Sequence, residues 1–165
     1  MRWEVPFFNV ELGLEEREAV KKVLLSNWLT SGPVILGFEE QFSRMLGDNV
    51  HAITVSSATA ALHLSLLALN IKPGDEVLLP TQTFVACANV IRYVGAIPVF
   101  VDITSETNWN ICTIDLKKKI SPKTKAIMPV HFAGYACDMK EIMEIAKSFN
   151  LKVIEDCSHA LFSMF

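Results

Sequence analysis

From residue 50 onward, short runs of apolar residues alternate with longer stretches that have helical spacing. This alternation is typical of a parallel sheet, because a parallel strand needs a crossover connection that is usually a helix. Runs this short and apolar indicate strands that are buried on both faces of the sheet. We therefore predict an α/β fold, a parallel-rich sheet with helices on both faces. The predicted strands span 50–55, 76–79, 97–101, 125–130 and 152–155, and the predicted helices span 58–69, 83–93, 114–120 and 139–149.

Residues 1–49 show the pattern of an arm followed by two helices. Apolar residues from Leu14 to Leu24 recur at helical spacing, and acidic residues stand in the first turn, where the helix dipole favours them. A turn over 30–33 separates this helix from a second one, which ends at Gly47. We predict two regions, 1–49 with the arm and two helices, and 50–165 with the sheet.

The composition excludes several classes of protein. Apolar residues make up 51% of the 165 residues and charged residues 20%, which is typical of a globular domain and not of a disordered chain. The formal net charge of −3 and the lack of a long basic block argue against a nucleic-acid partner. No apolar stretch is long enough for a membrane span, and the first residues lack the order of a signal peptide. The four cysteines lie far apart and fit reduced thiols, so we expect a cytoplasmic protein without a membrane partner.

Ligands of parallel α/β sheets bind just beyond the carboxyl ends of the strands, so the residues that follow each predicted strand are site candidates. After 50–55 come Ser57, Ala58 and Thr59, which are small residues that open a helix. The free N–H groups of such a helix start can bind a phosphate, and the two hydroxyls can add donors. The alternative is that Ser57 only caps the helix.

An aromatic residue and an acidic residue follow two other predicted strands. Phe84 comes after 76–79, where its ring can lie flat against a planar ligand; the alternative is a ring packed in the core. Asp156 directly follows 152–155, and a buried carboxylate needs a donor as its partner, such as the N–H of a protonated pyridine ring. The alternative for Asp156 is a helix N-cap. His159 is expected one helical turn beyond Asp156, on the same side.

His131 follows the strand predicted over 125–130 and is a further candidate for ligand contact, although a histidine at a strand end is more often held by structural hydrogen bonds. A phosphate site, a stacking ring and a buried acid, in this order along a parallel sheet, indicate a coenzyme pocket. We predict no metal site. The residues predicted to bind the coenzyme are Ser57, Ala58, Thr59, Phe84, Asp156 and His159.

The sequence resembles the DegT/DnrJ/EryC1/StrS group of pyridoxal-phosphate-dependent sugar aminotransferases. The resemblance runs through nearly the whole chain, and its segments follow one another in the family's order and spacing. The matching segments are Asn27-Trp28-Leu29-Thr30-Ser31-Gly32-Pro33, Ser57-Ala58-Thr59-Ala60-Ala61-Leu62-His63, Pro73-Gly74-Asp75-Glu76-Val77, Thr83-Phe84-Val85-Ala86 after Pro80, Gly95-Ala96-Ile97-Pro98-Val99-Phe100-Val101-Asp102, Pro129-Val130-His131, and Val153-Ile154-Glu155-Asp156 leading to His159-Ala160.

The resemblance implies a fold, a coenzyme and a reaction. The fold over 50–165 is the first part of the large domain of the aspartate-aminotransferase-like fold type I. The coenzyme is pyridoxal 5'-phosphate (PLP), which serves the transfer of an amino group, usually from glutamate, to a keto group of a nucleotide-linked sugar. Such sugars are precursors of polysaccharides, cell-surface sugars or secondary metabolites, and the whole protein is expected to be a homodimer.

The resemblance also implies a role for each matched residue. Ala58 and Thr59 are expected to hold the coenzyme phosphate. Phe84 is expected to stack on the pyridine ring, and Asp156 to pair with the ring nitrogen. His159 is expected to approach the phenolic oxygen of the ring.

Two features depart from the family pattern. Ala58 stands where the family often has glycine, a small change that still permits a close backbone approach. The lysine that forms the Schiff base in the family lies beyond the last residue of this sequence, because Lys152, the last lysine, precedes Asp156. We therefore expect a truncated large domain that has no catalytic residue of its own and is inactive alone. We also expect a gap in the sheet beside the strand predicted over 50–55.

Two other functions remain open from the sequence. Some proteins that resemble this family carry histidine in place of the lysine and act as sugar dehydratases. A non-catalytic module that binds a phosphorylated ligand at Ser57–Thr59 is the second alternative.

Overall fold

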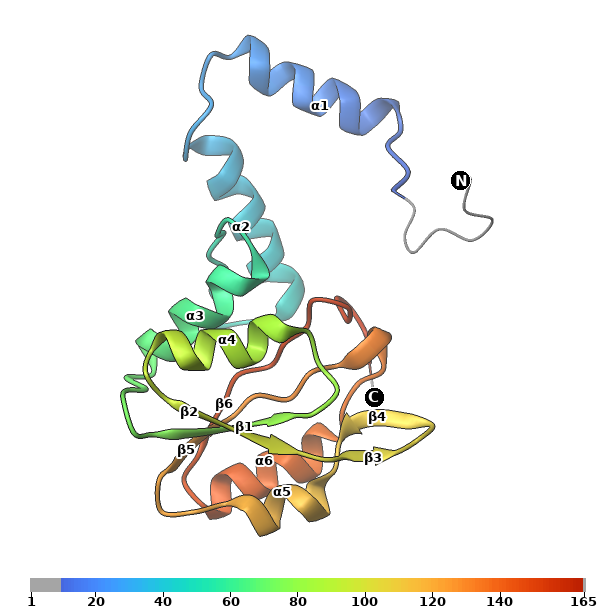
Figure 1. Ribbon diagram of the computed structural model, residues 1–165. Coiled ribbons are helices and arrows are strands. Elements are labelled where there is room, and N and C mark those ends of the chain that lie inside the picture. Colours follow the sequence, from blue (N-terminus) through green and yellow to red (C-terminus); the bar gives the residue numbers. More distant parts are fainter. Residues whose placement is uncertain (1–9, 165) are drawn as a thin grey trace, which may run out of the picture. The chain divides into compact units, whose positions relative to one another are not determined.

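The computed structural model describes residues 10–164 (Figure 1). The chain divides into two compact units, Met1–Thr54 and Val55–Phe165. Part of the predicted arm, residues 1–9, lies outside the described residues. Among the helices of the described residues, none is both long and apolar enough for a membrane crossing.

The first unit contains the two helices predicted for it, α1 (Leu14–Leu25) and α2 (Pro33–Leu46). Proline at the first position of α2 fits a helix start. The backbone N–H at this position has no acceptor within a helix, so proline, which lacks an N–H, loses no hydrogen bond there. The helix ends at Gly47, whose φ of 117° is a conformation that residues with a side chain rarely adopt. None of residues 10–54 is buried.

The strand predicted over 50–55 was wrong, since these residues form no strand. A strand needs a neighbour that pairs with its backbone, and here side chains of α2 take that role. The N–H of Ala52 donates to the hydroxyl of Ser43 (2.9 Å), and the N–H of Thr54 donates to the carboxylate of Glu39 (2.7 Å). Ile53 between them is 81% exposed.

The second unit is built on the predicted parallel sheet. Its strands are arranged in the order β2-β1-β5-β6, and every pairing in this sheet is parallel. The predicted helices are also present, each within a few residues of its expected ends. The strands are β1 (Glu76–Pro80), β2 (Ile97–Val101), β5 (Thr124–Ile127) and β6 (Lys152–Val153), and the helices are α3 (Ala58–Ala68), α4 (Val85–Tyr93), α5 (Thr113–Lys119) and α6 (Met139–Ser148).

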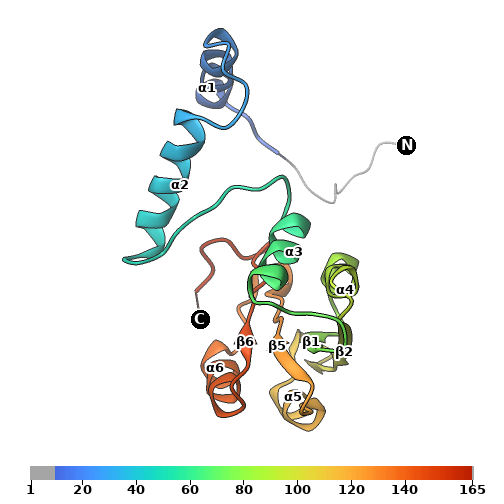
Figure 2. The same cartoon turned by 90° about the vertical axis from the view of Figure 1, so that its left-hand side faces the viewer.

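Helices cover both faces of this sheet, as Figures 1 and 2 show: α3 and α4 lie on one face, and α5 and α6 on the other. Alternate residues of β1 pack against the helices on the two faces, because successive side chains of a strand point to opposite faces of the sheet. Val77 and Leu79 belong to the apolar cluster of α3 and α4, and Leu78 belongs to that of α5 and α6. All three side chains are fully buried, which explains why β1 reads as a continuous apolar run.

A small antiparallel hairpin, β3 (Ile103–Ser105) and β4 (Asn108–Ile111), was not predicted from the sequence. Its strands are too short to show a clear alternation of apolar and polar residues. A short 3-10 helix, η1 (Phe132–Gly134), follows β5 and includes Ala133 at a φ of 52°.

The strand order reverses at β1, because β2 lies on one side of it and β5 on the other. Such a reversal leaves a crevice at the carboxyl ends of the strands, where ligands of this class of sheet bind. The ladder between β5 and β6 continues past both strands as a single bridge between Val130 and Asp156. The sheet thus brings the segments that follow β1, β5 and β6 to one edge.

Candidate functional site

A cavity of about 230 Å³ is formed at this edge by residues of the second unit. Five of the six predicted coenzyme-binding residues line it, and Ser57 does not. They come from the start of α3, from the segment after β1 and from the segment after β6. The lining residues are Ala58, Thr59, Leu62, Phe84, Ala86, Val130, Asp156, Ser158 and His159.

The start of α3 presents free backbone donors to the cavity. Ser57 is the N-cap, and its hydroxyl oxygen accepts the N–H of Ala60 at 3.1 Å, which is the capping alternative that the sequence left open. The first intrahelical bond runs from the N–H of Ala61 to the carbonyl of Ser57. The N–H groups of Ala58 and Thr59 therefore have no acceptor among the described residues, and with the positive end of the helix dipole they suit an anion.

Phe84 is not a core residue. It is the N-cap of α4, with an extended backbone, and its side chain is 68% exposed. The helix begins at Val85, so Phe84 lies directly before its first turn, and its side chain lines the cavity. An exposed aromatic face in a cavity can cover a planar ligand.

Asp156 is buried, with 7% of its surface exposed, and three donors hold its carboxylate. Oδ1 accepts the backbone N–H and the hydroxyl of Ser158, at 3.0 and 2.5 Å. Oδ2 accepts the thiol of Cys87 at 3.1 Å. A carboxylate offers about four acceptor positions. One position, on Oδ2, is thus left open by the described residues, and it is available to a ligand in the cavity.

The carboxyl group of Asp156 is charged at neutral pH. Burial by itself raises the pKa of this group, but hydrogen bonds from Ser158 and Cys87 outweigh burial, and the net pKa is below its ordinary value. The backbone is fixed as well, because the N–H of Asp156 donates to the carbonyl of Pro129 and its carbonyl accepts the N–H of His131. Residues 157–164 form turns and no helix, so Asp156 caps no helix within the described residues and the N-cap alternative was wrong.

His159 lines the same cavity as Asp156, although the chain between them forms turns and not the expected helical turn. The ring nitrogen Nδ1 accepts the N–H of Ala133 at 3.3 Å, so Nε2 carries the proton, and it has no acceptor among the described residues. The ring of Phe132 contacts His159 edge-on, with 5.9 Å between centroids.

His131 is a structural residue and does not line the cavity. Its side chain is buried, Nδ1 accepts the N–H of Cys137 at 3.0 Å, and Nε2 lies 3.0 Å from the carboxylate of Glu155. Since Nδ1 is an acceptor, Nε2 carries the proton and donates to Glu155. The ligand atoms of His131, Glu155 and Cys157 lie within 4.8 Å of one another. However, a protonated Nε2 has no lone pair for a metal ion, and it is instead hydrogen-bonded to Glu155.

Sequence reasoning missed two residues that touch the carboxylate of Asp156. Ser158 could have been found, because Asp followed two residues later by Ser is a pattern in which an aspartate accepts the N–H of residue i+2. Cys87 could not, because it contacts Asp156 across 69 residues of sequence and only the fold brings the two together.

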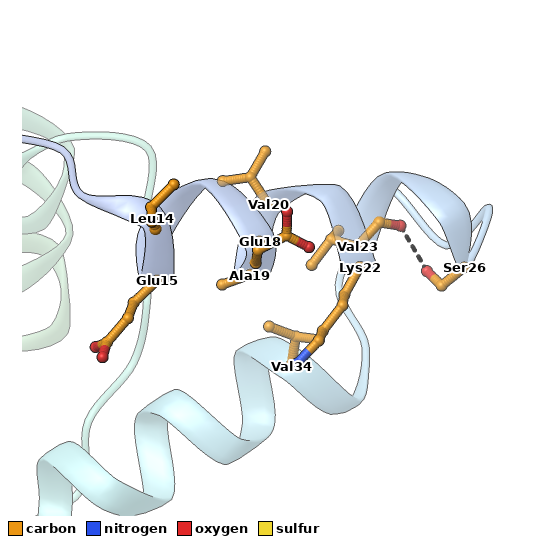
Figure 3. Close-up of a pocket in the computed structure, with 9 residues that line it drawn as sticks. All are labelled: Leu14, Glu15, Glu18, Ala19, Val20, Lys22, Val23, Ser26 and Val34. Atoms are coloured by element: carbon orange, nitrogen blue, oxygen red, sulfur yellow. Dashed lines mark hydrogen bonds between the residues drawn. The ribbon is translucent and has the colours of Figure 1, made fainter.

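A larger cavity of about 830 Å³ belongs to the first unit, between α1 and α2 (Figure 3). Its walls are mainly aliphatic, with Leu14, Val20 and Val23 from α1 and Val34 from α2. None of the predicted site residues lines it.

Known proteins resemble this chain over nearly its whole length. Residues 11–165 match the family model of the DegT/DnrJ/EryC1/StrS aminotransferase family. The chain is 48% identical over 162 residues to GDP-perosamine synthase of Escherichia coli O157:H7, covering 98% of this chain and 44% of the relative.

Two solved structures share the fold over most of the chain. The aminotransferase from Psychrobacter cryohalolentis matches with a TM-score of 0.89 and 38% identity, over 97% of this chain and 41% of that one. Spr1654 from Streptococcus pneumoniae in its PLP form matches with a TM-score of 0.88 and 32% identity, over 97% of this chain and 44% of that one. The chain thus spans less than half the length of each of these relatives.

Proposed function

The chain belongs to the DegT/DnrJ/EryC1/StrS aminotransferase family, and we propose that its described residues form the coenzyme-binding part of a PLP-dependent sugar aminotransferase. One observation carries the proposal. A single cavity joins a helix start with free N–H groups, an exposed aromatic ring and a charged carboxylate that has one open acceptor position.

These groups fit PLP in charge and in hydrogen bonding. The N–H groups of Ala58 and Thr59, with the Thr59 hydroxyl, would hold the phosphate. The ring of Phe84 would cover one face of the pyridine ring. Oδ2 of Asp156 would accept the N–H of the ring nitrogen, and Nε2 of His159 would donate to the phenolic oxygen. When bound, PLP supplies an electron sink for the transfer of an amino group.

Asp156 has the task of keeping the ring nitrogen protonated. A carboxylate with a lowered pKa stays charged, and a charged partner favours the protonated form of the nitrogen. The proton therefore stays at the ring nitrogen, where it strengthens electron withdrawal by the ring. The resemblance places the lysine of the family outside these residues, so the proposal assigns them coenzyme binding and not turnover.

The substrates are proposed from the family and from one relative. The name GDP-perosamine synthase supports a nucleotide-linked sugar. Glutamate as the amino donor is proposed from the family resemblance alone. The cavity of about 230 Å³ is smaller than the roughly 300–1,000 Å³ of pockets for drug-sized ligands. Its volume therefore suits the coenzyme, which is one ring with a phosphate, and not a whole nucleotide sugar. A homodimer, a cytoplasmic location and a role in polysaccharide or secondary-metabolite sugars remain predictions.

Binding of PLP by the 165-residue chain, measured by equilibrium dialysis, tests the proposal. We expect Asp156→Asn to weaken binding by about 10- to 100-fold, because asparagine lacks the negative charge that favours the protonated ring nitrogen. Asp138→Asn is the matched control: Asp138 caps α6 through the N–H of Glu141, and asparagine caps equally well. Equal affinity of the two variants would overturn the assignment of Asp156.

The phosphate site is tested with pyridoxal, which lacks the phosphate. We expect PLP to bind more tightly than pyridoxal, and Thr59→Val to reduce this preference, whereas Thr107→Val in the hairpin leaves it unchanged. If inorganic phosphate alone displaces PLP and the Asp156 variant binds normally, the chain is better described as a phosphoryl-binding module.

A further inference from the structure

The thiol of Cys87 contacts the carboxylate of Asp156 inside the protein. Cys87 stands in the first turn of α4 and has no exposed surface. Its Sγ lies 3.1 Å from Oδ2 of Asp156, and it is not among the residues that line the cavity. Asp156 thus presents its carboxylate to the cavity while Cys87 holds it from the protein side.

The thiol is a donor in this contact. The hydroxyl of Thr83 donates to Sγ at 3.1 Å, so the sulfur accepts one hydrogen bond and gives another to Oδ2. Burial first of all, together with the negative charge of Asp156, raises the pKa of the Cys87 thiol to about 12. The S–H is therefore kept throughout the neutral pH range, and the donor is permanent.

The position of this donor decides which part of the carboxylate remains open. Ser158 supplies two donors to Oδ1, so that oxygen is saturated. Cys87 supplies one donor to Oδ2, which leaves one acceptor position there. Because donors from both sides fix the carboxylate, it cannot rotate to exchange its two oxygens without breaking hydrogen bonds.

We propose that Cys87 is a positioning residue whose thiol holds Asp156 so that the open acceptor position of Oδ2 faces the coenzyme's ring nitrogen. This inference rests on the proposed function, since it takes the ring nitrogen as the ligand of Asp156. It adds a role for Cys87, which does not itself line the cavity. Thr83 orients the sulfur in turn, so the chain of bonds runs from Thr83 through Cys87 to Asp156.

The first experiment needs no coenzyme. The pKa of the Asp156 carboxyl is followed by NMR in the chain labelled with carbon-13 aspartate. We expect Cys87→Ala to raise this pKa toward its ordinary value and Cys87→Ser, which retains a donor, to restore it. Cys137→Ala is the matched control, because Cys137 is equally buried but donates to the carbonyl of Val130. An unchanged pKa in Cys87→Ala would overturn the proposal.

The second experiment measures recognition of the ring nitrogen. Its probes are PLP and the analogue in which a carbon atom replaces that nitrogen. We expect the unmodified chain to prefer PLP by about tenfold or more, from one hydrogen bond to a charged group. Cys87→Ala should lower this preference to about threefold, while Cys87→Ser and Cys137→Ala keep it.

The outcomes separate the inference from the proposed function. If the unmodified chain binds both probes equally, Asp156 does not recognise the ring nitrogen, and the proposed function fails together with the inference. If the unmodified chain prefers PLP and Cys87→Ala prefers it equally, only the role of Cys87 is overturned. A general loss of folding in Cys87→Ala would lower affinity for both probes alike, and Cys87→Ser then decides: a preference kept by serine supports the role, and a lost one contradicts it.

Discussion

The two units of this chain use apolar residues in opposite ways. In the first, α1 and α2 carry many apolar side chains, yet none of residues 10–54 is buried. In the second, two apolar clusters fill the space between the sheet and its helices, and the side chains of Leu66, Leu78 and Leu79 are fully buried. Helical spacing alone therefore gives helices without a core, whereas a sheet with two covered faces gives a core and an edge that can hold a ligand.

The largest difference between the two units is expected when one leucine in each is truncated. Leu66→Ala in α3 removes a fully buried side chain, and we expect it to lower the free energy of unfolding by about 2–5 kcal/mol. Leu25→Ala in α1 removes a side chain that is 72% exposed, and we expect a change within about 0.5 kcal/mol. Both changes place alanine in a helix, so helix propensity affects them alike. Urea unfolding of both variants measures the difference, and equal losses would contradict the contrast.

The cysteines of the second unit test whether its core is closed. Cys87 and Cys137 are buried, whereas Cys157 is exposed. We expect a thiol reagent such as Ellman's reagent to modify Cys157 at least about 100-fold faster than the two buried thiols, which react only when the core opens. Rates of the single-cysteine variants at neutral pH give the comparison. Similar rates for Cys87 and Cys157 would mean that the core opens easily.

One carboxyl group in each unit makes its stability depend on acid pH. Hydrogen bonds from the backbone and side chain of Thr54 lower the pKa of Glu39. Although burial raises it, the pKa of Asp156 is also lowered, by Ser158 and Cys87. A lowered pKa in the folded state stabilises the protein above the unfolded pKa, which is near 4, and this stabilisation is lost as the pH falls through the folded value.

We expect Asp156→Asn and Glu39→Gln each to flatten the loss of stability below about pH 4, because an amide does not titrate. The change should be larger for Asp156→Asn, because Asp156 is buried and Glu39 is only half-buried. Unfolding in urea at a series of pH values from about 2 to 7 checks the two slopes. A steeper acid dependence in Asp156→Asn would show that the sign of its pKa change is wrong.

The smallest effects are expected from ion pairs, which should not distinguish the units. Arg44 and Glu40 form a pair within α2, and Lys117 of α5 forms one with Glu141 of α6. The first pair is exposed and the second is partly exposed, so we expect Glu40→Gln and Glu141→Gln each to cost less than about 0.5 kcal/mol of unfolding free energy. If either substitution lowered the free energy of unfolding by more than about 1 kcal/mol, charge as well as apolar burial would contribute to the difference in stability between the units.

The sequence allowed most of the second unit to be predicted, because strands such as β1 are buried on both faces and are bounded by helices with clear spacing. The same rule failed at 50–55, where the apolar run forms no strand because Ser43 and Glu39 take its N–H groups. Ala58, Thr59, Phe84, Asp156 and His159 could be predicted to meet because the carboxyl ends of parallel strands share one edge. Contacts behind that edge, such as Cys87 with Asp156, depend on packing and leave no local signal.

A crystal structure of the protein grown with PLP would show whether the cavity holds the coenzyme. We predict that one coenzyme molecule spans the cavity, with its phosphate on the N–H groups of Ala58 and Thr59 and its ring nitrogen about 3 Å from Oδ2 of Asp156. A coenzyme bound elsewhere, or one whose ring nitrogen is turned away from Asp156 while its phosphate is held by other residues, would contradict the account.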